Sequence, residues 1–140
     1  MPAILSSDLT IVDWAQLAVV FERAPLGQRE PERLRQTFQN SGVRCFAWDG
    51  HSLVGAGRAI TDGLNYAVIF DVVVLPEYQR QGIGGQIMKY LAEHSKAQNI
   101  LLHSVPGMEK FYERLGYRRL KTGMGLFAEP EKWHRRGYIE

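Results

Sequence analysis

Apolar residues recur at helical spacing in two early stretches of the chain, 14–21 and 31–42. The first stretch follows Thr10-Ile11-Val12-Asp13, which has the form of a helix capping box. Pro31 stands where a helix accepts proline, as its first residue, and Gly42 closes the second stretch. The pattern predicts two consecutive helices.

The spacing of apolar residues then changes from that of a helix to that of a strand. Residues 43–48 and 52–60 read as strands, and Asp49-Gly50 between them is a strong hairpin turn. A third run, about 65–74, is rich in Val and Ile and predicts another strand. Antiparallel pairing follows from such short connections.

The second half alternates between the two periods. We expect a helix over about 84–96, a short strand over 99–103, a helix over 108–115 ended by Gly116, and a closing pair of strands at 117–120 and 124–127. The order ααβββαβαβ(β) predicts one α+β domain over 1–140, built on a mostly antiparallel sheet.

Composition narrows the classes of protein. The chain has 140 residues, 45% of them hydrophobic, and a net charge of only +2, so nucleic acid is not an expected partner. No apolar run approaches the roughly 20 residues of a membrane span, and the N-terminus lacks the features of a signal peptide. The single cysteine, Cys45, is expected to be buried in a strand and suits a reducing compartment. We therefore expect a cytoplasmic protein.

The stretch Gln79-Arg80-Gln81-Gly82-Ile83-Gly84-Gly85 lies between a strand and a helix. Glycines let an anion approach the backbone, and the first amides of a helix attract negative charge, so the stretch predicts a phosphate or pyrophosphate site. A P-loop would require Lys followed by Ser or Thr where Gln86 stands. A dinucleotide fingerprint would follow the first strand of an early βαβ unit, which is missing here.

These residues carry a resemblance to a known family. Residues 79–84 match the Q/R-x-x-G-x-G/A signature, by which GCN5-related N-acetyltransferases (GNAT) bind the pyrophosphate of coenzyme A. The lead-in 72–78 is similar to the family's V-x-P-x-Y, and 111–117 resembles F-Y-x-x-x-G-F/Y. The family's usual Asn before the final helix is missing around 105–108, so local contacts to the coenzyme should differ.

The resemblance implies a GNAT-type splayed sheet with helices on both faces and acetyl-CoA as cosubstrate, without a metal. It implies that backbone groups of the strand end pair with the pantetheine arm and that amides of the glycine loop bind the pyrophosphate. The side chains of Gln79 and Arg80 either add contacts or are solvated. The implied coenzyme-binding residues are Val72, Val73, Val74, Gln79, Arg80, Gln81, Gly82, Ile83, Gly84 and Gly85.

Acetyl transfer requires a neutral amine, a polarised thioester carbonyl and a proton for the leaving thiolate. Tyr112 matches the family's tyrosine and is the candidate acid, because a phenol near pKa ~10 is protonated at neutral pH. Asp71 interrupts an apolar strand and could orient the acceptor amine or serve a structural role. His103 is of the residue type best suited to a base, although a structural histidine remains an alternative.

The acceptor is not defined by these residues. The stretch around Asp71 resembles E-D-[VI]-x-V of glucosamine-phosphate N-acetyltransferases, but Phe70 replaces the first acid, which argues against that substrate. Arg29 could meet an acidic acceptor, and Trp14, Phe21 and Phe127 could line an aromatic pocket or belong to the core.

Three functions are compatible with these features. The leading one is transfer of acetyl from acetyl-CoA to the primary amine of a small molecule by direct attack. The others are acetylation of proteins or peptides, and coenzyme A sensing without turnover. The expected partner is a small-molecule amine, with a homodimer as an option.

Overall fold

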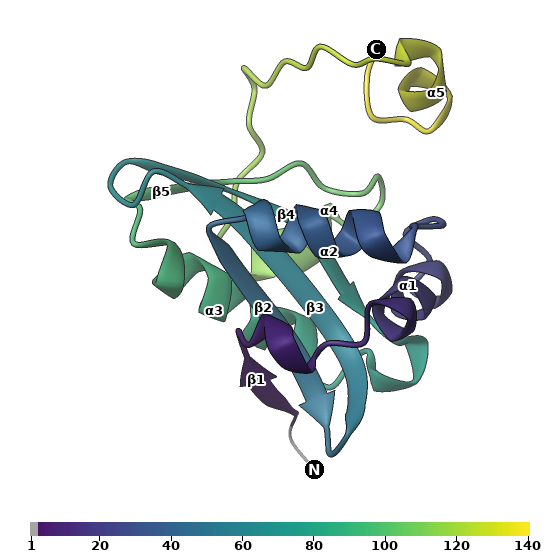
Figure 1. Cartoon of the computed structure of the whole chain (residues 1–140). Coiled ribbons are helices and arrows are strands. Elements are labelled where there is room, and N and C mark those ends of the chain that lie inside the picture. Colours follow the sequence, from purple (N-terminus) through teal and green to yellow (C-terminus); the bar gives the residue numbers. More distant parts are fainter. Residues whose placement is uncertain (1–2) are drawn as a thin grey trace. The chain divides into compact units, whose positions relative to one another are not determined.

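The computed structural model describes residues 3–140, which divide into two compact units (Figure 1). Unit 1 runs to Leu102, and unit 2 is His103–Glu140. Each unit is described by itself.

Unit 1 contains a five-stranded sheet in which the strands follow one another in sequence order. Consecutive strands from β1 to β4 pair antiparallel, and β4 pairs parallel with β5. The α+β class and the mostly antiparallel sheet are thereby confirmed. The strands are β1 (Ile4–Ser6), β2 (Val43–Asp49), β3 (Ser52–Thr61), β4 (Tyr66–Val74) and β5 (Asn99–Leu101).

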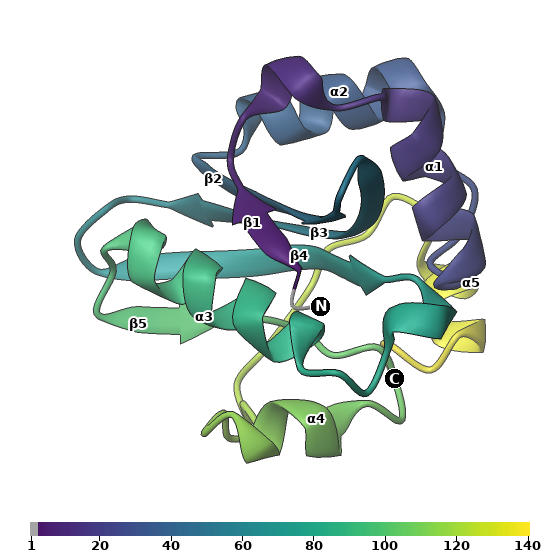
Figure 2. The ribbon, with the colours of Figure 1, turned by 90° about the horizontal axis from the view of Figure 1, so that it is seen from below.

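Helices cover both faces of this sheet. Figure 2 shows α1 (Trp14–Arg23) and α2 (Pro31–Asn40) on one face and α3 (Ile83–Ser95) on the other. The predicted helical faces are the ones that are buried, with Phe21 and Phe38 fully enclosed. The ring centroids of Phe38 and Phe46 lie 5.4 Å apart, and Trp14 packs against both rings. Trp14 and Phe21 are therefore core aromatics.

The start of α1 differs from the prediction. Thr10 lies in a short 3-10 helix, Leu9–Ile11, and Asp13 caps α1 by accepting hydrogen bonds from the amides of Ala15 and Gln16. The capping-box interpretation of Thr10 is therefore wrong, because Thr10 lies inside a 3-10 helix that Asp8 caps, and α1 begins only after Asp13. Pro31 is the first residue of α2, as predicted.

The cysteine thiol lies inside the sheet. Cys45 is fully buried in β2, as expected from the sequence. Burial raises the pKa of its thiol to about 12, so the thiol stays protonated.

A β-bulge interrupts β4 at Asp71. Arg58 of β3 pairs with Phe70 and Ala56 pairs with Val73, so Gly57 alone stands opposite two residues. Asp71 adopts φ +57°, a left-handed conformation that is uncommon for any residue except glycine. The bulge shifts the alternation of β4 by one residue just before its last three valines.

Two glycines let α3 pack closely on β3. A Cβ atom at Gly57 would lie 2.8 Å from Cγ2 of Ile87 and 2.9 Å from Cδ1 of Leu91. A Cβ atom at Gly55 would lie 2.9 Å from the carbonyl oxygen of Val73. The close approach of helix and strand requires residues without side chains at both positions.

Unit 2 holds two short helices, α4 (Glu109–Arg114) and α5 (Pro130–Arg135). The predicted closing strands 117–120 and 124–127 are wrong, since these residues form no strand. Gly123 and Gly125 flank Met124, and glycine disfavours strands. Met124 and Leu126 are fully exposed, so residues 124–127 bury no apolar face whose burial would stabilise strand pairing.

The packing of Gly55 predicts a stability change. Gly55→Ala should lower the free energy of unfolding by about 1–3 kcal/mol, because the new methyl group meets a backbone oxygen that cannot rotate away. Gly42→Ala is the control, since a Cβ atom there meets only Cγ2 of Thr61 at 3.5 Å. Urea unfolding of both variants measures the difference. Equal stability of the two variants would contradict this account of the helix–strand contact.

Candidate functional site

The glycine loop turns the chain from β4 into α3 through two left-handed residues. Arg80 has φ +64° and Gly82 has φ +85°. Gly82 is the N-cap of α3 and offers no side chain to the helix, whose first hydrogen bond runs from the amide of Gln86 to the Gly82 carbonyl. The amides of residues 83–85 thus precede the helical ladder and are not covered by a capping side chain. This geometry suits an anion.

Side chains of the loop brace it. The Gln79 amide donates to the carbonyl oxygen of Val74 at 2.9 Å, and the Gln81 amide donates to that of Glu77 at 3.2 Å. Arg23 binds the Glu77 carboxylate through two hydrogen bonds of 2.8 and 2.7 Å. The two glutamines therefore hold the loop against the strand end, while the Arg80 side chain is exposed.

The strand that leads into this loop is paired by β5 over only part of its length. Residues 66–68 of β4 pair with β5, whereas β4 continues to Val74. Within unit 1, β5 leaves the edge of residues 69–74 open. The backbone of Val72, Val73 and Val74 lies on this edge, directly before the loop. A short 3-10 helix, Pro76–Tyr78, and the glycine loop connect this strand end to the start of α3.

Asp71 is held by two arginines at the bulge. Its Oδ1 accepts from Nη2 of Arg29 at 3.1 Å, and its Oδ2 accepts from Nε of Arg58 at 2.8 Å. The side chain of Asp71 is only 13% exposed. The guanidinium of Arg29 stacks on Phe21 at 4.5 Å and that of Arg58 on Phe70 at 4.8 Å. The α1–α2 loop, β3 and β4 meet at this carboxylate.

The charge state of Asp71 follows from these contacts. Burial alone would raise the pKa of the carboxyl, but attraction to Arg29 and the hydrogen bond from Arg58 outweigh it and lower the pKa. Asp71 is therefore ionised at neutral pH and is a weak base. A carboxylate in this state can orient a cation or hold the bulge.

Sequence reasoning missed Arg58, and it did not connect Arg29 to Asp71. A signal was present for Arg58, because a charged residue inside the apolar run 53–60 needs a partner. The two residues that meet it, Ser41 and Asp71, are far away in the sequence. Only the register of the sheet reveals the pairing.

The remaining candidates lie in unit 2. Tyr112, on α4, is half-buried, and burial together with nearby Tyr138 and Tyr117 raises the pKa of its phenol. His103 is exposed, and its ring lies 6.4 Å from that of Tyr138. Sequence reasoning gave Tyr138 no role, although it interacts with both candidates. Asp71 and the glycine loop belong to unit 1.

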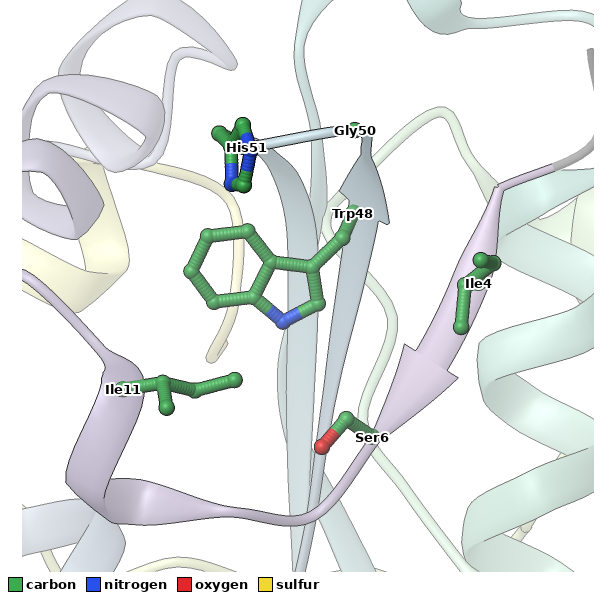
Figure 3. Close-up of a pocket in the computed structure, with 6 residues that line it drawn as sticks. All are labelled: Ile4, Ser6, Ile11, Trp48, Gly50 and His51. Atoms are coloured by element: carbon green, nitrogen blue, oxygen red, sulfur yellow. The ribbon is translucent and has the colours of Figure 1, made fainter.

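A separate hollow lies at the opposite edge of the sheet. It has a volume of about 390 Å³ and lies beside β1, with Ser6 and Trp48 on its wall (Figure 3). The indole N–H of Trp48 is buried and has no hydrogen-bond partner among the described residues. None of the predicted site residues lines this hollow. Its lining is Ile4, Ser6, Ile11, Trp48, Gly50 and His51.

Within residues 3–140, no three or more His, Cys, Asp or Glu side chains gather in a way that could hold a metal ion. In the same part of the chain, no helix has the length and apolar character to cross a membrane.

Comparison with known proteins agrees with the fold. A family model described as "Acetyltransferase (GNAT) domain" matches residues 13–124, a stretch that includes parts of both units. A putative acetyltransferase from Deinococcus radiodurans R1 superposes with a TM-score of 0.78 at 26% identity, covering 99% of this chain and 94% of that one. An open sheet with this loop defines an N-acetyltransferase fold. The chain belongs to the GCN5-related N-acetyltransferase family.

Two similar curated relatives come from plants. The serotonin N-acetyltransferase 2, chloroplastic, of Oryza sativa subsp. japonica is 34% identical over 115 residues, which is 77% of this chain and 58% of the relative. The GCN5-related N-acetyltransferase 1, chloroplastic, of Arabidopsis thaliana is 40% identical over 109 residues, 73% of this chain and 54% of the relative. The chain thus spans little more than half the length of these two relatives.

The pairing of Asp71 predicts a pH-dependent stability. Asp71→Asn should lower the free energy of unfolding by about 1.5–3 kcal/mol at pH 7, because asparagine tolerates the left-handed backbone but loses the charge-assisted hydrogen bonds. The lowered pKa of Asp71 means that its contribution is complete above about pH 4, the unfolded value, and is lost as pH falls through the folded value. The deficit of the variant should therefore shrink at pH 3.

Urea unfolding at pH 7 and pH 3 checks this expectation. Glu32→Gln is the control, because its ion pair with Arg35 lies on the exposed surface of α2 and should matter little at either pH. A deficit of Asp71→Asn that is the same at both pH values would show that the ionised carboxylate is not what stabilises the bulge.

Proposed function

We propose that the protein is an acetyl-CoA-dependent N-acetyltransferase that transfers the acetyl group to the primary amine of a small molecule by direct attack. The observation that carries the proposal is the uncapped start of α3, to which a short 3-10 helix, Pro76–Tyr78, and the glycine loop lead from the end of β4, whose edge β5 leaves open within unit 1. Family membership supports the same reaction class. Metal chemistry is not part of the proposal.

The residues present fit the coenzyme. Gly82 leaves the amides of Ile83, Gly84 and Gly85 accessible, and a helix of 13 residues adds a partial positive charge at its start. The backbone of residues 72–74 offers strand hydrogen bonds of the kind that a pantetheine amide accepts and donates. Gln79 and Gln81 keep the loop in this conformation through their bonds to the backbone.

In the reaction the amine nitrogen attacks the thioester carbonyl carbon, the C–S bond breaks, and the amine proton leaves. We assign polarisation of the carbonyl to a backbone N–H of the open strand edge, which acts as an oxyanion-hole donor. Tyr112 donates its phenolic proton to the departing thiolate, and its raised pKa keeps that proton available at neutral pH. Asp71 orients the incoming ammonium group.

The general base is assigned to His103. Asp71 does not suit this step, since its pKa is lowered and two guanidiniums compete for its lone pairs. A histidine can accept a proton near neutrality and pass it to solvent, and His103 is exposed.

A small-molecule acceptor is supported by one relative that is named for serotonin, a primary amine. Turnover with a panel of amines, polyamines, amino acids and peptides, measured by the release of free thiol, separates small-molecule from peptide acceptors.

A reducing compartment such as the cytoplasm suits the single buried thiol of Cys45. The two plant relatives are named chloroplastic.

The loop conformation predicts how coenzyme binding can be removed. Gly82→Val should abolish most of the rise in melting temperature caused by acetyl-CoA, because valine disfavours the left-handed backbone that aims the amides. Gly63→Val is a matched control: Gly63 has φ +75°, and a Cβ atom at either glycine meets nothing within 4 Å. Thermal unfolding with and without acetyl-CoA is the measurement. A full ligand shift in Gly82→Val would refute the assignment of the loop.

Tyr112 predicts a loss of turnover without a loss of binding. Tyr112→Phe keeps the ring and removes only the proton donor, so kcat should fall by about 10²–10⁴-fold while the melting temperature and acetyl-CoA affinity stay nearly constant. Tyr117→Phe is the control. The phenol of Tyr117 lies beside that of Tyr112 and also has a raised pKa, but it has no assigned role, so this variant should keep its turnover. Steady-state kinetics measures both. Full turnover in Tyr112→Phe would contradict the assignment of Tyr112 as the acid and would mean that water protonates the thiolate.

A further inference from the structure

Three arginines on the α1/α2 side of unit 1 are linked to one another through Asp71 and Ser41. Arg44 of β2 and Arg58 of β3 are directly paired in the sheet register, so their side chains share a face. Both reach Ser41, Arg44 through the carbonyl oxygen at 3.0 Å and Arg58 through Oγ at 3.3 Å. Arg29 joins them through Asp71. We call Arg29, Arg44 and Arg58 the arginine cluster.

The charges of this cluster do not balance. Among the ion pairs of residues 3–140, Asp71 is the one carboxylate that meets any of the three arginines, which leaves an excess of two positive charges. Like charges directly opposite on neighbouring strands are destabilising. The last carbonyls of α2 offset part of this, because Arg44 binds there. The arrangement retains an unfavourable charge that an anionic ligand would relieve.

The cluster also has hydrogen-bond donors to spare. A guanidinium carries five N–H donors, and the bonds within the protein use one on Arg29 and two on Arg58. Stacking on Phe21 and Phe70 fixes the planes of these two groups. Arg29 is 32% exposed, so it can be reached from solvent. Fixed planar donors with solvent access are suited to bidentate recognition of a carboxylate or phosphate.

The position of the cluster relates it to the acceptor. Asp71 directly precedes residues 72–74, whose backbone the proposed function pairs with the pantetheine arm of the coenzyme. A carboxylate with arginines beside it offers one anionic and several cationic groups within one side-chain length. That pattern complements a ligand that carries an ammonium group close to an anionic oxyacid group.

Resting on the proposed function, we infer that the acceptor amine carries an anionic group, a carboxylate or a phosphate, which the arginine cluster binds while Asp71 faces the ammonium. Arg29 and Arg44 are then specificity-determining residues. A neutral side chain at Arg44, which binds Ser41 rather than Asp71, should leave coenzyme binding intact and remove much of the preference for the anionic acceptor.

Matched acceptor pairs test the inference. Tryptophan differs from tryptamine by a carboxylate, and phosphoethanolamine differs from ethanolamine by a phosphate. Calorimetric titration of each compound into the protein, with and without saturating coenzyme A, should show at least one anionic member binding about tenfold to 100-fold tighter than its neutral partner. The pair that shows the preference identifies carboxylate or phosphate as the group recognised.

Variants of the arginine cluster test whether these residues cause the preference for the anionic acceptor. Arg29→Gln and Arg44→Gln should each reduce this preference by about tenfold or more and change the affinity for the neutral partner little. Arg35→Gln is the control, because Arg35 lies on the exposed side of α2 with Glu32. Equal binding within both pairs, no binding of any of the four compounds, or equal losses for anionic and neutral members in the variants would overturn the inference. Failure of the proposed function is a different result: coenzyme A then gives no binding signal of its own.

Discussion

The pairing of Asp71 with Arg29 and Arg58 fixes the point at which the alternation of side chains along strand β4 shifts by one residue. A left-handed backbone costs an L-residue roughly 1–2 kcal/mol. Charge-assisted hydrogen bonds contribute about 1.5–3 kcal/mol each, so two of them exceed that strain. The bulge is therefore stable, and it sets which backbone groups of the last three valines face the open edge. The α1–α2 loop is tied to the same point through Arg29.

The two ends of the proposed site are stabilised by different kinds of interaction. At the bulge, ion pairs and aromatic stacking hold three separate segments together. At the loop, two glutamines return to the backbone, and a glycine leaves the helix start uncovered. The first arrangement depends on charge, the second on backbone conformation. The proposed coenzyme site uses backbone groups from both places, the end of β4 and the start of α3.

Local chemistry made much of this architecture predictable from the sequence. Pro31, Gly82 and Gly116 mark helix boundaries because their backbone preferences are strong, and the apolar faces of α1 and α2 are buried as their spacing indicates. The strand β1 was missed because three residues carry no periodicity. The prediction of strands over 117–127 was based on short apolar patterns. A strand forms only when it pairs with a neighbouring strand, and a local pattern of apolar residues does not show whether such a neighbour exists. Likewise, Arg58 and Asp71 meet through sheet register, which has no local signal.

The edge of β4 that β5 leaves open has a consequence for handling the protein. Residues 69–74 combine Ile, Phe and three Val with one charge, and a strand edge of this composition that is unpaired within unit 1 is a template on which other chains can add. The bulge and the inward-held Asp71 interrupt that template in its middle. A ligand lying along the edge would complete the ladder and shield it. The concentration of coenzyme would then affect how readily the folded protein aggregates, as well as the rate of acetyl transfer.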